Sequence, residues 1–192
     1  MADKEDNGKW KVLESEYLVQ NKWVNVKREK IRLPNNKIIE DYYIIERPDS
    51  VIVFCLTKQN KILILKQYKH GAQEEIHEIP AGMIDDGETP EEAAKREVLE
   101  ETGYKYEKIE KIGTIFLDPT ATRSVCHIFF ATGAEKVSEQ KLDQTEDITV
   151  MEMTKEEVLE NLKNSTLNSG IVPGAIFLGL EKMKDMEDES AK

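Results

Sequence analysis

The distribution of apolar and polar residues divides the chain into two stretches of different character. From Trp10 to Ile45, β-branched and aromatic residues are mixed with charged ones, and Pro34-Asn35-Asn36 provides a turn signal. This pattern predicts a small sheet. A sheet of two or three strands is marginal by itself, so we expect it to pack on the rest of the chain, on a second subunit, or on both. Pro48-Asp49-Ser50 marks a boundary, which predicts an N-terminal β-sheet subdomain at residues 1–49 and a larger domain at residues 50–192.

The larger domain combines apolar runs with helical patterns. Two capping boxes, Thr89-Pro90-Glu91-Glu92 and Thr154-Lys155-Glu156-Glu157, predict helix starts, and Gly103 is a natural end for the first helix. An amphipathic helix is predicted from Pro173 to about Met183, followed by a frayed acidic tail from Lys184. Strands interrupted by one helix and closed by two others predict a mixed sheet between helical layers. The predicted strands are Val51–Leu56, Lys61–Tyr68, Ile109–Phe116, Val125–Ala131 and Ile148–Met153, with a polar loop at Lys69–Glu75.

Composition and charge narrow the range of functions. Of the 192 residues, 39% are hydrophobic and 34% are charged, which allows a core inside a highly charged shell. The net charge of −11 argues against non-specific binding to nucleic acid or to an anionic membrane, and it means that an anionic substrate needs local cations. Cys55 and Cys126 lie in apolar runs and are expected in the core. Without a signal peptide or an apolar run of about 18 residues, we expect a cytoplasmic protein, with the polar residues 1–8 disordered.

Three glutamates share one face of the first predicted helix. Glu97, Glu100 and Glu101 are spaced i, i+3 and i+4, so their carboxylates lie on adjacent turns and repel one another. A hard divalent cation such as Mg²⁺ removes that repulsion, because carboxylate oxygens suit it as ligands. Arg96 can pair with Glu100 one turn later. The alternative interpretation is a solvated acidic helix, which is what most charge runs are.

The surrounding pattern is more specific than an acidic helix. Gly82 is followed by five residues, Glu88, seven further residues, and then Arg96-Glu97-Val98-Leu99-Glu100-Glu101-Thr102-Gly103-Tyr104. This pattern resembles the full Nudix box, with Tyr104 standing where an aliphatic residue is more usual. The resemblance implies an α/β/α sandwich with a mixed sheet over about residues 50–183. It also implies hydrolysis of a nucleoside diphosphate linked to another group.

Residues outside the box resemble the ADP-ribose and ADP-sugar pyrophosphatase branch of this family. The run from Glu78 to Pro90 is similar to that branch, and Pro119 lies sixteen residues beyond Gly103, close to its characteristic proline. Lys66-Gln67-Tyr68 is also similar, although Lys69 stands where arginine is usual. The branch uses an N-terminal sheet to form a homodimer with composite active sites, so the resemblance implies a nucleotide-sugar substrate and a homodimer.

The resemblance also implies contacts with the substrate. Trp23 and Tyr42 are similar to positions where some members place aromatic rings around the adenine, and stacking of this kind tolerates different bases. Packing in the sheet or in a dimer interface is the alternative for both rings. Arg47 and Lys69 match cationic positions and are candidates for phosphate contact, with exposed surface charges as the alternative. Pro119 belongs to a loop expected to face the substrate beyond the diphosphate.

The remaining roles implied by the resemblance concern the metal and the attacking water. Glu97, Glu101 and the carbonyl of Ala81 would bind Mg²⁺, with Mn²⁺ as a substitute and Glu100 near or between ions. Glu88 and Arg96 would hold the geometry of the site. Glu146 resembles the glutamate on a late loop that activates the water in this branch. The catalytic set is therefore Glu146, Glu100, Arg96 and Glu88, and the rivals of Glu146 are Glu139, Asp143 and Asp147.

Several alternatives stay open. Residues 118–124 depart from the Pro-Gly pattern common in the branch, so ADP-sugars other than ADP-ribose, and GDP-sugars, remain candidates. A Nudix hydrolase of nucleoside triphosphates or dinucleoside polyphosphates is the runner-up, with the N-terminal sheet and Pro119 against it. A non-catalytic nucleotide-sugar sensor is the competitor from another class. An acidic metal-binding or interaction protein is a third possibility, although it would not need Gly82, Arg96 and Gly103 at their positions.

Overall fold

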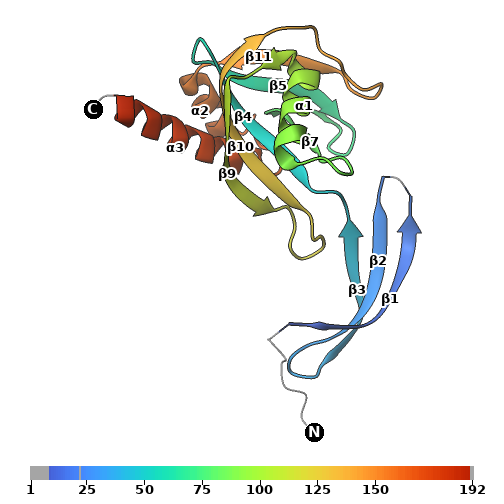
Figure 1. The fold of residues 1–192 in the computed structure, drawn as a ribbon. Helices are drawn as coiled ribbons and strands as arrows, with labels where there is room; N and C mark the ends of the chain where they lie inside the picture. Colours follow the sequence, from blue (N-terminus) through green and yellow to red (C-terminus); the bar gives the residue numbers. More distant parts are fainter. Residues whose placement is uncertain (1–8, 22, 191–192) are drawn as a thin grey trace. The chain divides into compact units, whose positions relative to one another are not determined.

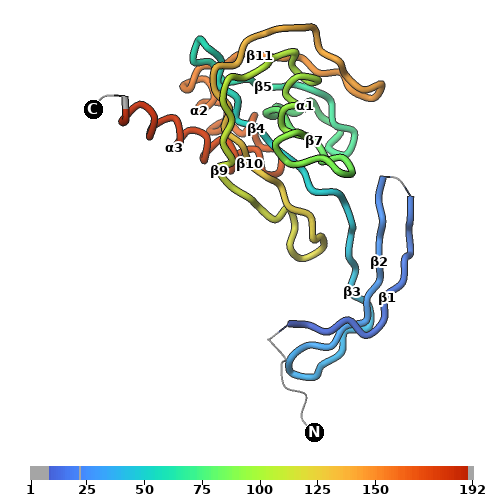
Figure 2. The backbone as a smooth tube through the Cα atoms, viewed as in Figure 1, coloured from blue at the N-terminus to red at the C-terminus, as the bar shows by residue number. Residues whose placement is uncertain are grey.

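The computed structural model describes residues 9–21 and 23–190, and the expectation for residues 1–8 falls outside them. The chain folds as two compact units. The N-terminal unit comprises the chain up to Pro48 together with residues 118–124, and the core unit comprises the rest, from Asp49 onward. Figures 1 and 2 show the elements of each unit.

The N-terminal unit is a three-stranded antiparallel sheet, which confirms the predicted small sheet. Its strands are β1 (Lys11–Gln20), β2 (Asn25–Arg32) and β3 (Ile38–Glu46), in the order β1-β2-β3. Asn36 adopts a φ of 62° in the turn between β2 and β3, where the turn signal lies. Residues 118–124 join this unit along β3, because the Ile45 N–H donates to the Ala121 carbonyl at 2.7 Å.

The core unit contains an eight-stranded mixed sheet with the path β11-β5-β4-β10-β8. Strand β4 pairs in parallel with β10, whereas the other pairs are antiparallel. Strands β6, β7 and β9 join β5, β4 and β10 respectively. The strands are β4 (Ser50–Thr57), β5 (Ile62–Lys69), β6 (Glu74–Glu78), β7 (Ala81–Met83), β8 (Tyr104–Lys105), β9 (Lys108–Phe116), β10 (Val125–Lys136) and β11 (Ile148–Met153).

Helices cover both faces of this sheet, as Figure 1 shows. Alternate residues of β4 point to opposite layers. Ile52, Phe54 and Leu56 pack in the core shared with α2 (Lys155–Lys163) and α3 (Val172–Ser190), whereas Val51, Val53 and Cys55 pack against α1 (Pro90–Thr102). The α/β/α sandwich with a mixed sheet is therefore confirmed. Cys55 and Cys126 are buried free thiols, as expected for core residues.

Local signals set the ends of α1 as predicted. The Thr89 hydroxyl accepts the Glu92 N–H, and the Glu92 carboxylate accepts the Thr89 N–H at 2.8 Å, which completes the capping box. Gly103 ends the helix with a left-handed φ of 75°. These caps fix where the helix begins and ends, at Pro90 and Thr102.

Three sequence predictions of local structure were wrong. The polar loop predicted at Lys69–Glu75 ends earlier, because β6 begins at Glu74 and pairs with β5. Strand β10 continues beyond Ala131 to Lys136, where its last residues pair with β8. The acidic tail predicted to be frayed is helical to Ser190, as the continuation of α3. In the described part of the chain, no helix has the length and apolarity needed to span a membrane.

Candidate active site

Helix α1 holds its acidic face in a fixed orientation. Ala93, Ala94 and Val98 are fully buried against the sheet and anchor the helix from its inner side. The neighbouring Glu101 side chain is also buried, with 4% of its surface exposed. Glu100 has 37% of its side chain exposed, so glutamates on the same helical face differ in environment.

Arg96 donates hydrogen bonds to three carboxylates through its guanidinium group. Its Nε and Nη2 donate to the two oxygens of Glu88, each at 2.9 Å, so this pair is bidentate. Its Nη1 donates to Glu97 Oε1 at 2.7 Å and to Glu100 Oε2 at 3.4 Å, and the latter is the expected i, i+4 pair. Hydrogen bonding to Arg96 holds the pKa of Glu88 below its usual range. Arg96 also donates to the carbonyl of Met83, which ties the cluster to β7.

Glu101 has much less charge compensation than Glu88. Its Oε2 accepts the Ala81 N–H at 3.0 Å, and burial raises the pKa of its carboxyl well above the ordinary value. The negative charges of Glu97 and Glu146 raise that pKa further. Burial likewise raises the pKa of Glu97, although its hydrogen bond to Arg96 opposes the effect. Buried carboxylates with raised pKa values are typical of functional sites.

Gly82 allows a carboxylate to lie against the backbone of β7. A Cβ atom at this position would stand 1.9 Å from Glu97 Oε1. Any larger residue therefore forces the Glu97 carboxylate to move. Because Ala81 and Gly82 are neighbours on β7, this short strand contacts both Glu97 and Glu101.

Glu146 lies on the segment between β10 and β11 and is close enough to the helix to affect its carboxylates electrostatically. Its charge raises the pKa of both Glu97 and Glu101. Its own Oε2 accepts the Asp143 N–H at 3.0 Å, within a turn in which the Glu146 N–H donates to the Asp143 carbonyl. The rivals Asp143, Asp147 and Glu139 are exposed side chains.

Lys69, at the end of β5, is a cation of the core unit that acts on the carboxylates of α1. Its charge lowers the pKa of Glu101, although less than burial raises it. Its Nζ is 3.1 Å from Glu78 Oε2, and the other oxygen of Glu78 accepts a hydrogen bond from Ser169 Oγ at 2.8 Å. Sequence reasoning missed Glu78 as the partner of Lys69, although Glu78 begins the run that leads to Gly82.

The other substrate-contact candidates belong to the N-terminal unit. Tyr42 donates its hydroxyl to the Thr120 carbonyl at 2.5 Å, and its ring meets Trp10 edge-on with the centroids 5.8 Å apart. The Arg47 carbonyl accepts the Ser124 hydroxyl at 2.6 Å, and its side chain is exposed. The structure therefore attaches the Pro119 segment, residues 118–124, to β3 and to the residues that follow it. Trp23, in the turn between β1 and β2, is 72% exposed.

The carboxylate cluster suits a divalent cation in its donor chemistry. Glu97, Glu100, Glu101 and Glu146 offer hard oxygen ligands, and a cation would relieve the repulsion among the buried charges. Across residues 9–21 and 23–190, however, no three acidic, histidine or cysteine side chains already converge as a set of ligands. The hydrogen bonds explain this, because Arg96 engages Glu97 and Glu100 while the Ala81 N–H engages Glu101.

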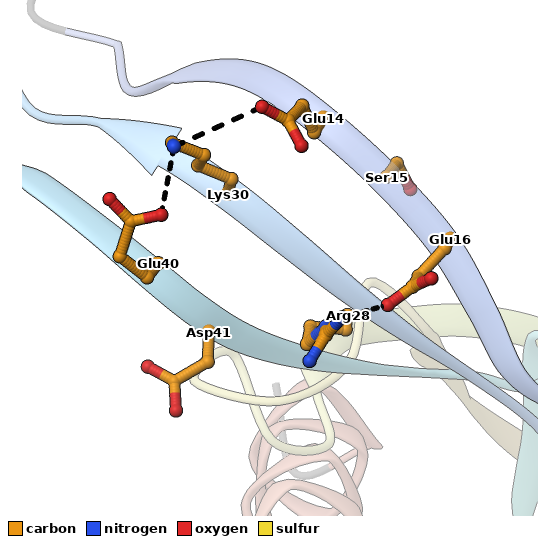
Figure 3. Close-up of a pocket in the computed structure, with 7 residues that line it drawn as sticks. All are labelled: Glu14, Ser15, Glu16, Arg28, Lys30, Glu40 and Asp41. Carbon is orange, nitrogen blue, oxygen red and sulfur yellow. Dashed lines mark ion pairs between the residues drawn. The ribbon is translucent and has the colours of Figure 1, made fainter.

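A hollow of about 670 Å³ in the N-terminal unit has a different character (Figure 3). Lys30 lies between Glu14 and Glu40, at 3.9 and 2.8 Å, and Arg28 pairs with Glu16. Together with Asp41, four carboxylates oppose two cations along its lining. This acidic balance does not suit a diphosphate, so the hollow is not a candidate for the substrate site.

Comparisons with known proteins identify the family and the fold. Residues 46–171 match the family described as NUDIX domain, and residues 10–45 match the nucleoside diphosphate sugar hydrolase N-terminal domain. The chain is 34% identical to an ADP-ribose pyrophosphatase of Bacillus subtilis, over 78% of this chain and 81% of the relative. It is 30% identical to a methanol dehydrogenase activator of Bacillus methanolicus, over 90% of this chain and 94% of that relative. A crystal structure of an ADP compounds hydrolase has the same fold, with a TM-score of 0.82 at 21% identity, covering 93% of this chain and 96% of that chain.

Proposed function

Because the chain belongs to the Nudix hydrolase family, we propose that it hydrolyses the diphosphate bond of ADP-ribose or a related nucleotide sugar, giving AMP and a sugar phosphate. Mg²⁺ is the proposed cofactor, with Mn²⁺ as a substitute. The observation that carries the proposal is the burial of Glu101 beside Glu97 on a helix with the complete box pattern. The matching N-terminal domain, which is described by its action on nucleoside diphosphate sugars, supports the substrate class.

The carboxylates and Arg96 have distinct proposed tasks. Glu97, Glu101, Glu100 and the Ala81 carbonyl hold the cation. When bound, the cation neutralises the diphosphate oxygens and makes a water molecule more acidic. Arg96 keeps the Glu97 carboxylate oriented and is itself fixed by the bidentate pair with Glu88. Buried, hydrogen-bonded carboxylates lose little freedom when a ligand binds, which favours this arrangement.

Glu146 is the proposed general base. Its carboxylate takes a proton from the attacking water while the water oxygen bonds to a phosphorus atom of the diphosphate. The bond from that phosphorus to the bridging oxygen breaks, and the leaving phosphate keeps the electron pair. In the structure the Glu146 carboxylate accepts the Asp143 N–H, so one of its oxygens remains available for the water.

The N-terminal unit has a proposed role in recognition and assembly. Trp10, Leu18 and Trp23 are 50%, 49% and 72% exposed, and contact with a second copy of the chain would remove some of this apolar surface from water. We infer a homodimer in which residues 1–49 provide the dimer contacts and residues 50–192 form the hydrolase domain. The adenine contacts are assigned to Trp23 and Tyr42, and the phosphate contacts to Arg47 and Lys69. Pro119 is assigned to the part of the substrate beyond the diphosphate.

A substrate screen tests this function. Purified protein is incubated with ADP-ribose, other ADP- and GDP-sugars, nucleoside triphosphates and dinucleoside polyphosphates, with Mg²⁺, with Mn²⁺ or with a chelator. We expect AMP and ribose 5-phosphate from ADP-ribose, and no product with the chelator. Preference for triphosphates or dinucleoside polyphosphates would contradict the nucleotide-sugar assignment. Nucleotide-sugar binding without turnover of any compound would favour the sensor.

A further inference from the structure

The segment that follows β10 caps the C-terminal end of α1. The last carbonyls of a helix lack partners within the helix and need donors from elsewhere. Here the Glu100 carbonyl accepts the Lys141 N–H at 2.8 Å. One residue beyond the helix, the Gly103 carbonyl accepts the N–H groups of Val137 and Ser138, at 2.9 and 3.1 Å. Residues 137–141 are therefore attached to the helix that carries the box glutamates.

Gln140 completes this attachment and extends it. Its Nε2 donates to the Glu101 carbonyl at 2.6 Å and to the Ile148 carbonyl at 3.0 Å. The two acceptors also fix the orientation of the amide, since the side-chain oxygen in the same place would face two other oxygens. Glu101 is the buried carboxylate of the site, and Ile148 is the first residue of β11. One side chain thus joins the helix to both ends of the segment at residues 141–147, whose course is visible in Figure 2.

Within residues 141–147, Glu146 belongs to a local turn. Its carboxylate accepts the Asp143 N–H, and its own N–H donates to the Asp143 carbonyl. The two residues are therefore the first and the fourth of one turn. These bonds fix the shape of the turn but not its place above α1. The position of Glu146 relative to Glu97 and Glu101 therefore depends on where the two ends of the segment are held.

We propose that Gln140 is a positioning residue for catalysis. It holds the segment that carries Glu146 at a set distance from the carboxylates of α1, and this inference rests on the proposed role of Glu146 as the general base. Gln140 does not need to touch the substrate. Leucine has no N–H group on its side chain and cannot donate to either carbonyl, and the asparagine amide is one methylene shorter than that of glutamine.

Amide hydrogen exchange of the metal-free protein tests the attachment directly. In Gln140→Leu, with Gln140→Asn as the second variant, we expect faster exchange confined to residues 141–147. Gln144→Leu is the matched control, because Gln144 is exposed on the same segment and its side chain makes no hydrogen bond within the described residues. Unchanged exchange in both Gln140 variants would overturn the proposal.

Kinetics separate positioning from stability. We expect Gln140→Leu to lower kcat at least about tenfold with KM within about threefold of the wild type, because misplacement of a base affects the reaction step. Added to Glu146→Gln, the same change should cost less than about a further twofold, since Gln140 acts through Glu146. The proposal would be overturned if Gln140→Leu lowered the Tm and left kcat unchanged. It would also be overturned if the effects of Gln140→Leu and Glu146→Gln on kcat multiplied in the double variant.

The outcome also distinguishes this proposal from the proposed function. If the wild type releases no AMP from ADP-ribose, the substrate assignment fails, and the kinetic comparison moves to whichever nucleotide the screen identifies. The exchange result stands in either case. Faster exchange confined to residues 141–147 supports their attachment through Gln140. Unchanged exchange contradicts that attachment even if the hydrolase activity is present.

Discussion

Two glutamates of the site, Glu88 and Glu101, have opposite electrostatic environments. Glu88 forms a bidentate pair with Arg96, which lowers its pKa. Glu101 is buried with one backbone N–H as its hydrogen-bond donor, and burial raises its pKa. A compensated carboxylate stabilises the structure around it, whereas a buried carboxylate with little compensation costs stability. We interpret the Glu88–Arg96 pair as the structural framework of the site and the buried Glu101 carboxylate as its functional part.

Glu97 joins the two environments. Its carboxylate accepts a hydrogen bond from Arg96 at 2.7 Å, yet burial still raises its pKa. It also lies against Gly82, which places it next to the strand that contacts Glu101. The following changes test whether the framework and the functional part can be separated.

Among the changes made outside α1, loss of the proposed base gives the largest effect on the rate. Glu146→Gln keeps the size of the side chain but removes its ability to take a proton. We expect kcat for ADP-ribose to fall about 10²- to 10⁴-fold, the range typical of general acid–base catalysis, with little change in KM. Steady-state rates with Mg²⁺ measure this, and Glu139→Gln, at an exposed position in residues 137–141, is the control. Equal rates for the wild type and Glu146→Gln would show that the base lies elsewhere.

Displacement of Glu97 gives the next largest effect. Gly82→Ala places a methyl group where the Glu97 carboxylate lies, so the carboxylate must move. We expect kcat to fall about 10- to 100-fold, as for other small misplacements of catalytic groups. Gly71→Ala is the matched control, because no atom lies within 4 Å of a Cβ built there. If both variants keep the wild-type rate, the contact between Gly82 and Glu97 has no catalytic importance.

Removal of the framework cation tests stability. Arg96→Met leaves Glu88, Glu97 and Glu100 without their shared partner, and we expect a loss of about 1–3 kcal/mol in the free energy of unfolding. Arg28→Met, which removes an exposed ion pair with Glu16, should cost no more than about 0.5 kcal/mol. Urea unfolding in the presence of a chelator measures both. Equal losses would contradict the distinction between this cluster and a surface pair.

Neutralising Glu101 should have the smallest effect on stability, and this effect is of the opposite sign. Because burial raises its pKa above the ordinary 4.5, the folded chain binds more protons than the unfolded chain between those two pKa values. The stability of the metal-free wild type therefore falls as pH rises through that window. Glu101→Gln has no carboxyl group at this position and does not lose stability in this way. At pH 7 its Tm should therefore be about 2 °C higher than that of the wild type, and near pH 4 the two Tm values should be equal. A lower Tm for the variant at pH 7, measured with a chelator, would contradict the cost assigned to the buried charge.

Local signals in the sequence were enough to predict much of the core unit. The caps of α1 depend on Thr89, Glu92 and Gly103, which are close together along the chain, and the structure confirms them. Strands β4 and β5 were predicted for a similar reason, since each contains a continuous apolar run. The offsets of Glu88 and Arg96 also indicated one cluster, which the hydrogen bonds between them now describe.

Features that depend on distant partners were not predictable. Strand β7 has three residues and owes its conformation to pairing with Ser50–Ile52, about thirty positions earlier in the chain. Helical periodicity places Glu100 and Glu101 on one face but does not predict which of them is buried. Glu101 is the buried one, and its carboxylate contacts β7 through the Ala81 N–H. Gln140 carries no sequence signal at all, since its two acceptors come from the end of α1 and the start of β11.

The rate of AMP release from ADP-ribose by Glu101→Gln, with saturating Mg²⁺, measures whether the buried carboxylate of α1 takes part in catalysis. The substitution keeps the shape of the side chain and removes the charge that the account assigns to cation binding. We predict a loss of at least about 10³-fold relative to the wild type, in a variant that unfolds cooperatively at the same or a higher temperature. A rate within about tenfold of the wild type would show that the buried carboxylate of α1 is not part of the catalytic site.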